Sequence, residues 1–319
     1  MTGSFDTGVM EYRKLGGTDL QVSLLGFGTA PLGDVYGTTD PLEGTRAVHL
    51  AIENGINFFD SSPYYGVTLA EERLGQALVG KRHKVVLATK CGRYGLKEFD
   101  FSAQRIARSI DESLRRLQTD YLDLFQAHDI EFGDVEQVIN ETVPAMRKIQ
   151  EQGKARFIGI TGYPLKTLLR VAKAVPVDTI LSYCRYNLMV TDMDDVLTPF
   201  AKTQGIGLIN AAGLHMGILT AAGEQAWHPA PPEVRAAGRK LASLCREHRV
   251  DIAEVAIRFC LDHPYVSSTL VGIPSRAQLT ASLKLLSTKT DPELINEMRQ
   301  AIAPVLNRIW PSGRPENYG

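Results

Sequence analysis

The sequence predicts an α/β fold, namely a (β/α)8 TIM barrel with an N-terminal β-hairpin and extra C-terminal helices. Short apolar runs alternate with longer amphipathic stretches, and each run is bounded by Gly, Pro or polar residues. Such runs are typical of strands buried on both faces. Eight strand–helix units favour a closed barrel over a doubly wound sheet. The expected strands are residues 24–27, 57–60, 85–89, 121–127, 156–160, 179–182, 207–211 and 268–271.

A Rossmann fold is not expected, because most of the α/β units lack a glycine fingerprint. The stretch Gly26-Phe27-Gly28 is a lone G-x-G without the third glycine that opens a helix. We interpret it as a turn-forming sequence.

Helix signals lie between the expected strands. Gly55 is placed to end one helix, Ser102 to cap the start of another, and Pro164 to begin a third. Residues 10–22 are predicted to form a β-hairpin that closes the bottom of the barrel. We expect one barrel domain over residues 1–319. The predicted helices are residues 42–54, 102–117, 135–152, 164–175, 232–249 and 251–262, and residues 292–306 with the tail 310–313 are expected to fold back over the mouth of the barrel.

Composition excludes several classes of function. The net charge is −1 and no long run of one sign occurs, so nucleic-acid and membrane-surface binding are not expected. The N-terminus lacks a signal peptide, and no apolar run reaches the ~20 residues of a membrane span. We expect a cytoplasmic protein, a monomer or small homo-oligomer, with free thiols. The cysteines, which show no C-x-x-C pattern, are Cys91, Cys184, Cys245 and Cys260.

Polar residues follow successive apolar strands. Asp60 ends the second strand, Lys90 the third and His128 the fourth, and Tyr65 lies in the loop after the second. In a barrel these carboxyl ends meet at one face. An ordinary tyrosine, with a pKa of about 10, is a poor base at neutral pH. We expect the Lys90 ammonium to lower the pKa of Tyr65, so that Tyr65 exchanges protons near neutral pH. Asp60 is expected to orient Lys90, and His128 to hold a substrate oxygen. No metal is expected.

Each of these residues also has an ordinary structural interpretation. Asp60 could cap a turn, Lys90 could be a surface lysine, Tyr65 could pack, and His128 could be satisfied by its neighbours. Taken one at a time, the structural interpretation is favoured roughly two to one. The four together on consecutive strand ends favour a shared catalytic site.

The chain resembles the aldo-keto reductase family. The resemblance covers nearly the whole chain and is carried by residues 60–66, 88–90, 159–161 and 270–272 and by His128. It implies a barrel that binds nicotinamide dinucleotide without a Rossmann fold. It also implies that Asp60, Tyr65, Lys90 and His128 are the catalytic residues.

Within the family the chain is most similar to dehydrogenases that act on L-galactose. That resemblance implies NAD-dependent oxidation of an aldose at C1 to the lactone, with L-galactose or L-fucose as substrate. The expected substrate contacts are Tyr65, Arg93, His128, Asp129 and Trp310. Further candidates from loops on the catalytic face are Tyr94, Glu131, His215, Trp227 and His228. The expected cofactor contacts are Gly28, Thr29, Asp60, Thr161, Tyr183, Ala212, Leu214, Gly217, Gly272, Pro274, Ser275, Arg276, Gln278 and Ser282.

The cofactor residues depart from the usual family pattern. Thr161 and Gly162 stand where typical members carry Ser-Asn, and Tyr183 stands where they carry Gln. We expect Tyr183 to stack on the nicotinamide ring. Pro274 occupies a position where NADP-preferring members often place Arg, which favours NAD, although Arg276 lies nearby.

Two alternatives remain open. One is another activity on the same scaffold, acting on pyridoxal or on a small aldehyde or ketone. The other is a cofactor-sensing binding protein similar to the channel-associated β-subunits of this family.

Overall fold

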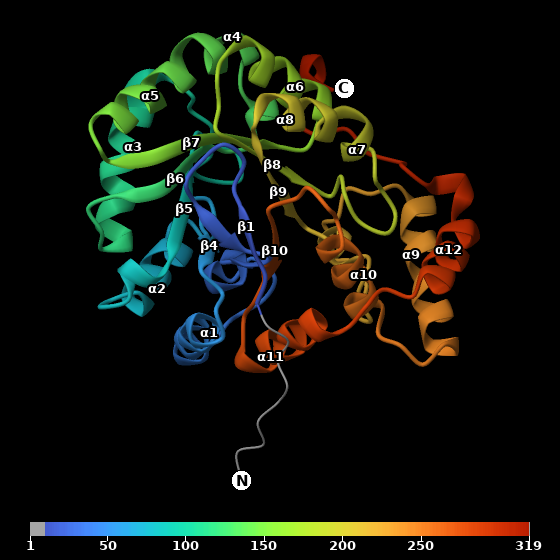
Figure 1. Ribbon diagram of the computed structural model, residues 1–319. Helices are drawn as coiled ribbons and strands as arrows, with labels where there is room; N and C mark the ends of the chain where they lie inside the picture. Colours follow the sequence, from blue (N-terminus) through green and yellow to red (C-terminus); the bar gives the residue numbers. More distant parts are fainter. Residues whose placement is uncertain (1–9, 319) are drawn as a thin grey trace.

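The computed structural model describes residues 10–318, and their strands form a closed parallel barrel (Figure 1). The strand order is β10-β3-β4-β5-β6-β7-β8-β9, so the predicted (β/α)8 barrel is confirmed. The strands are β3 (Leu25–Gly28), β4 (Phe58–Asp60), β5 (Val86–Cys91), β6 (Leu122–Ala127), β7 (Ala155–Gly162), β8 (Thr179–Tyr183), β9 (Gly207–Ala211) and β10 (Ser268–Gly272).

The predicted hairpin is present and closes the amino-terminal end of the barrel. Strands β1 (Tyr12–Lys14) and β2 (Gln21–Ser23) pair antiparallel. Leu15 and Leu20 from the turn join the apolar cluster inside the barrel, which includes Leu124 and Ile209. This end is filled mainly by apolar side chains, whereas the residues predicted to be catalytic lie at the opposite, carboxyl end.

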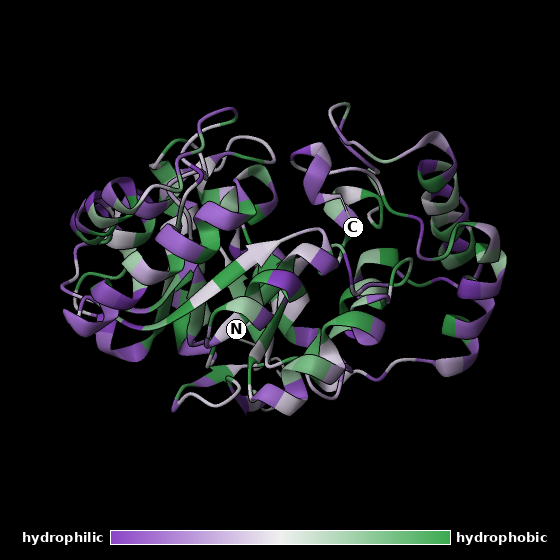
Figure 2. Ribbon diagram, turned by 90° about the horizontal axis from the view of Figure 1, so that it is seen from above, coloured by the Kyte–Doolittle hydropathy of each residue, from purple (hydrophilic) through white to green (hydrophobic). Residues whose placement is uncertain are grey.

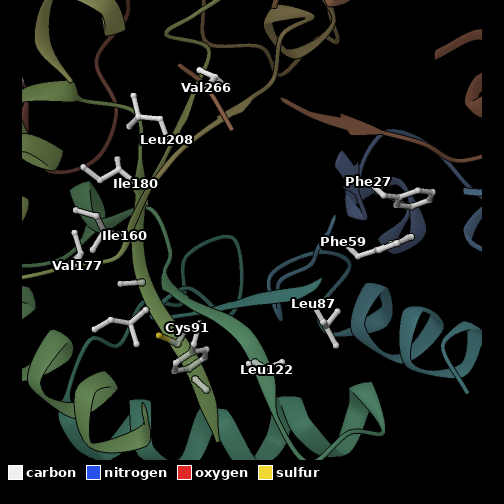
Figure 3. Packing of buried hydrophobic residues seen from close by; sticks show 14 of the residues in the cluster. Phe27, Phe59, Leu87, Cys91, Leu122, Ile160, Val177, Ile180, Leu208 and Val266 are labelled. Carbon is white, nitrogen blue, oxygen red and sulfur yellow. The ribbon is translucent and has the colours of Figure 1, made fainter. Parts of the chain in front are cut away.

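The helices cover the outside of the barrel, and a large apolar core fills the layer between them and the strands (Figure 3). Phe27 and Phe59, from neighbouring strands, stack in this layer with ring centroids 5.1 Å apart. The helices are α1 (Pro41–Glu53), α2 (Leu69–Ala77), α3 (Ala103–Leu117), α4 (Val135–Gln137), α5 (Val143–Glu151), α6 (Leu165–Ala174), α7 (Met193–Val196), α8 (Thr198–Gln204), α9 (Pro232–Glu247), α10 (Ile252–Leu261), α11 (Arg276–Lys284) and α12 (Pro292–Ala301).

One predicted helix is interrupted. The sequence predicts a single helix over residues 135–152, whereas the structure has α4 and α5 joined by a π-helical segment, Val138–Thr142. Pro144 lies in the first turn of α5. Proline has no N–H to donate to the carbonyl four residues earlier, so the regular α-helical ladder cannot continue through this point.

Seen from above, hydrophilic residues gather on the outer helices and loops, while the strands carry mostly hydrophobic colours (Figure 2). Among residues 10–318, no helix is long and apolar enough to cross a membrane. The four cysteines are buried and unpaired, as the sequence predicts.

Candidate active site

The four residues predicted to be catalytic lie together at the carboxyl ends of β4, β5 and β6. Asp60 is the last residue of β4, Lys90 is the penultimate residue of β5, and His128 directly follows β6. Tyr65 lies in the turn after β4, with its ring 5.7 Å from that of His128 and nearly perpendicular to it. The close approach expected from the sequence is therefore present.

Lys90 is the centre of the polar network. Its side chain is 1% exposed, and its ammonium donates to the Asp60 carboxylate, to the Ser61 carbonyl at 2.7 Å and to the Tyr65 hydroxyl oxygen at 3.3 Å. An ammonium has three protons to donate, and these three acceptors use all of them. Because Lys90 donates to the Tyr65 oxygen, the phenolic proton of Tyr65 is left for another partner.

Asp60 is held from both sides. One carboxylate oxygen accepts from Lys90, and the other accepts from Nε2 of Gln126 at 2.8 Å. Gln126 is fully buried on β6. This second contact fixes the carboxylate that in turn fixes the ammonium.

The expected acidification of Tyr65 is not found, and this corrects the sequence-based prediction. Burial raises the pKa of Tyr65 well above its ordinary value, and the nearby charges of Asp60 and Asp129 raise it further, against a lowering effect of Arg93. The positive charge of Lys90 is largely offset by its ion pair with Asp60. At neutral pH Tyr65 therefore keeps its proton and is a proton donor.

His128 is neutral in this site. Burial lowers its pKa well below the usual range, and the charges of Lys90 and Arg93 act in the same direction. The ring is 4% exposed, and its Nδ1 lies 2.9 Å from the Ser62 hydroxyl. A neutral imidazole in this position can hydrogen-bond to a substrate oxygen.

Arg93 and Asp129 form an ion pair beside His128. A guanidinium nitrogen of Arg93 lies 2.5 Å from the Asp129 carboxylate, and the guanidinium stacks 3.7 Å above the Tyr64 ring. Burial raises the pKa of Asp129, while the contact with Arg93 opposes that rise. The backbone N–H of Asp129 donates to the Thr161 hydroxyl. Thr161, which is expected to contact the cofactor, therefore also positions Asp129, which is expected to contact the substrate.

Tyr183 hydrogen-bonds to Glu131, a buried carboxyl that the sequence suggests only as a further substrate contact. Its hydroxyl donates to Oε1 of Glu131 at 3.1 Å. The same oxygen accepts from the backbone N–H of Tyr163 and from the Ser312 hydroxyl, whereas Oε2 is buried without a hydrogen-bond partner. Burial, with a contribution from Asp129, raises the pKa of Glu131 to about 8.

Trp310 lies within an aromatic cluster. It is 5% exposed, stacks on Tyr163 at 5.0 Å and meets the rings of His215 and His228 edge-on. This packing is a structural role, and a substrate contact of Trp310 stays a prediction.

The remaining cofactor candidates lie at the carboxyl ends of β3, β9 and β10 or in the segments that follow these strands. Gly28 ends β3 and pairs with Gly272, which ends β10. Ser275 caps α11 by accepting from the backbone N–H of Gln278. These positions surround one end of the barrel, as expected. The others are Thr29, Ala212, Leu214, Gly217, Pro274 and Ser282.

The loop before α11 suits an anionic phosphate. Helix α11 has nine residues, and the amino end of such a helix presents backbone N–H groups and a positive dipole end. The Arg276 guanidinium, by contrast, is engaged: its Nε and Nη2 each lie 3.0 Å from the Glu43 carboxylate. The residues present therefore fit the phosphates of a dinucleotide, with Arg276 already paired.

Unusual backbone conformations gather at this same end of the barrel. Val67, Asp129, Cys184 and Ala212 have positive φ values between 50° and 59° and follow β4, β6, β8 and β9 respectively. Non-glycine residues in this region of φ are strained, and such strain is enriched at functional sites. The clustering supports a functional role for this face.

Sequence reasoning missed Ser62 and Gln126, and it suggested Glu131 only as a substrate contact, without its buried hydrogen bonds to Tyr183 and Ser312. All three are fully buried. Ser62 hydrogen-bonds to His128, Gln126 to Asp60, and Glu131 to Tyr183. Ser62 and Gln126 are polar residues within or directly after predicted buried strands, and that is the signal that points to them. The burial of Glu131 has no comparable signal, because its contact with Ser312 depends on the path of the C-terminal tail.

Comparison with known proteins gives a consistent result. A family model described as the aldo/keto reductase family matches residues 24–303. L-galactose dehydrogenase of Arabidopsis thaliana is 45% identical over 97% of this chain and 99% of its own length. D-threo-aldose 1-dehydrogenase of a Pseudomonas species is 29% identical over 88% of this chain and 94% of its own length. The holo form of aldo-keto reductase AKR11C1 from Bacillus halodurans superposes with a TM-score of 0.77 at 26% identity, covering 97% of this chain and all of the other.

Proposed function

This chain is an enzyme that belongs to the aldo-keto reductase family, and we propose that it is an NAD-dependent dehydrogenase that oxidises an aldose at C1 to the lactone. L-galactose is the preferred candidate substrate, and L-fucose is a second one. The likeness to L-galactose dehydrogenase supports the choice of sugar. The observation that carries the proposal is the contact of Lys90 with the Tyr65 hydroxyl beside a neutral His128.

Tyr65 is proposed to carry the proton of the reaction. During oxidation its oxygen takes the proton of the C1 hydroxyl, and during reduction it returns one. Lys90 donates to the same oxygen and stabilises the phenolate, and Asp60 accepts from Lys90 and holds it in place. When bound, an oxidised nicotinamide supplies the hydride acceptor and one positive charge. Since burial keeps Tyr65 protonated, the oxidation rate should rise with pH as the phenolate becomes available.

Arg93 and Asp129 are proposed to recognise the sugar hydroxyls. Both side chains are mostly buried, at 14% and 6% exposure, and they already hydrogen-bond to each other. A site that hydrogen-bonds sugar hydroxyls discriminates against epimers, because a misplaced hydroxyl leaves a buried polar group unpaired.

A preference for NAD over NADP is proposed from the contact of Glu43 with Arg276. The 2′-phosphate of NADP needs a free cation, but the Arg276 guanidinium is bound by a carboxylate. The sequence argument from Pro274 points in the same direction. The change Glu43→Gln, which removes the competing charge, should raise kcat/KM for NADP⁺ relative to NAD⁺ by roughly two- to fivefold, because ionic contacts exposed to solvent are weak. An unchanged ratio would reject this role of Glu43.

A second candidate function is reduction of a small aldehyde such as pyridoxal. The retained proton on Tyr65 favours it, because a protonated phenol is the form required to protonate a reduced carbonyl oxygen.

Initial rates distinguish the two functions. L-galactose, L-fucose and D-galactose are each tested with NAD⁺ and with NADP⁺ by following absorbance of the reduced cofactor, and pyridoxal is tested with NADH. We expect the highest kcat/KM with L-galactose and NAD⁺. Equal rates for the two galactose enantiomers, or turnover of pyridoxal alone, would reject the proposed activity.

We also propose that the protein works in a reducing, cytoplasmic compartment as a monomer or small homo-oligomer. Four buried unpaired cysteines support the choice of compartment.

A further inference from the structure

Ser62 lies between two parts of the site. It follows β4 by two residues and is fully buried. Its hydroxyl oxygen lies 2.9 Å from Nδ1 of His128 and accepts from the backbone N–H of Tyr64 at 3.1 Å. The proposed proton transfer through Tyr65 and Lys90 makes no use of this hydroxyl.

The direction of the Ser62–His128 hydrogen bond follows from counting protons. A serine hydroxyl has one proton and two lone pairs, and the Tyr64 N–H occupies one lone pair. Within residues 10–318 the hydroxyl has these two partners, and Nδ1 of His128 is the one that can accept a proton. If Nδ1 carried the proton instead, the hydroxyl proton of a fully buried serine would have no acceptor, which buried polar groups rarely tolerate.

We infer that Ser62 is a positioning residue that donates its proton to Nδ1 of His128 and thereby keeps the imidazole proton on Nε2. Nε2 lies 3.6 Å from the Asp129 carboxylate, which is beyond hydrogen-bond distance. The Nε2 proton therefore stays available for a substrate oxygen. The neutral state of the ring, which burial and two neighbouring cations favour, agrees with a single imidazole proton.

This inference rests on the proposed function only for the identity of the group that receives the Nε2 proton. The tautomer itself is a property of the protein without substrate or cofactor. The two ideas can therefore fail separately.

Nitrogen-15 NMR of the imidazole rings in the ligand-free protein tests the tautomer. The chain has seven histidines, so the His128 signals are assigned by their loss in a His128→Asn variant. We expect an unprotonated Nδ1 and a protonated Nε2 in the wild type. A protonated Nδ1 in the wild type would overturn the inference, whatever the sugar assay shows.

The variant Ser62→Ala should change this state, and Ser61→Ala is its matched control. The Ser61 hydroxyl is equally buried, one residue away, and bonds Thr29 rather than His128. With Ser62→Ala we expect a mixture of tautomers, a loss of about tenfold in kcat and a change of less than about threefold in KM, as for one lost hydrogen bond. With Ser61→Ala the His128 tautomer should be that of the wild type. Identical His128 spectra for Ser62→Ala and the wild type would contradict a positioning role.

Discussion

Replacing Glu131 by glutamine should stabilise the protein above pH 8 and have little effect below about pH 4. Glu131 is fully buried, its Oε2 has no partner, and burial raises its pKa to about 8. Glutamine has nearly the shape of the protonated acid, and it keeps an oxygen that can accept from Tyr163 and Tyr183. The change therefore removes the titration while retaining the contacts.

The sign and size follow from the pKa. The folded-state pKa is raised from 4.5 to about 8, so the folded protein holds a proton that the unfolded chain releases between these two values. The stability due to the neutral form is fully present below the unfolded pKa and is lost as pH rises through 8. Each pKa unit corresponds to about 1.4 kcal/mol of unfolding free energy, so the whole shift corresponds to an upper limit of roughly 5 kcal/mol. The loss is smaller if the tail at Ser312 opens and admits water to the carboxylate.

Urea unfolding at pH 5, 7 and 9 measures this effect. The advantage of Glu131→Gln over the wild type should increase with pH and level off above pH 9. Glu136→Gln is the matched control, because the Glu136 side chain is 63% exposed and should show no such trend. An advantage of Glu131→Gln that is the same at all three pH values would refute the assignment of a neutral buried acid.

Three further predictions concern the same network. Lys90→Met should cost about 3–5 kcal/mol of unfolding free energy, because it leaves the buried Asp60 carboxylate without its cation; an unchanged urea midpoint would argue against that. Gly313→Ala should loosen the C-terminal tail and cost more than ~1 kcal/mol, because Gly313 has φ +87° and an added Cβ would lie 2.3 Å from the Glu131 carbonyl; wild-type hydrogen-exchange protection in the tail would contradict it. The rate of sugar oxidation should still be rising with pH above the neutral range, because the raised pKa of Tyr65 leaves little phenolate at neutral pH, and a kcat that no longer changes with pH near neutrality would contradict that raised pKa.

The fold follows closely from local sequence patterns. All eight apolar runs became barrel strands, and Ser102 caps α3 by accepting from the backbone N–H of Arg105. These features depend on periodicity and on capping groups close in sequence. The interruption between α4 and α5 was missed, although Pro144 was visible as a residue that cannot donate a hydrogen bond.

The site could be predicted in position but not in electrostatics. Asp60 and Lys90 were placed correctly because parallel strands end at one face of a barrel. The pKa of Tyr65 was predicted in the wrong direction, because desolvation and the cancelling charge of Asp60 depend on three-dimensional burial. The burial and raised pKa of Glu131 were missed for a related reason: a contact with Ser312, 181 positions away in the sequence, leaves no local pattern.

The proton-transfer role of Tyr65 is tested most directly by Tyr65→Phe. This change removes the hydroxyl that Lys90 contacts at 3.3 Å and retains the ring. We expect kcat for L-galactose oxidation to fall by roughly 10²- to 10⁴-fold, the usual contribution of a general acid–base group, while NADH binding, measured by fluorescence, stays within about twofold of the wild type. A variant that keeps more than about a tenth of the wild-type kcat would contradict this role.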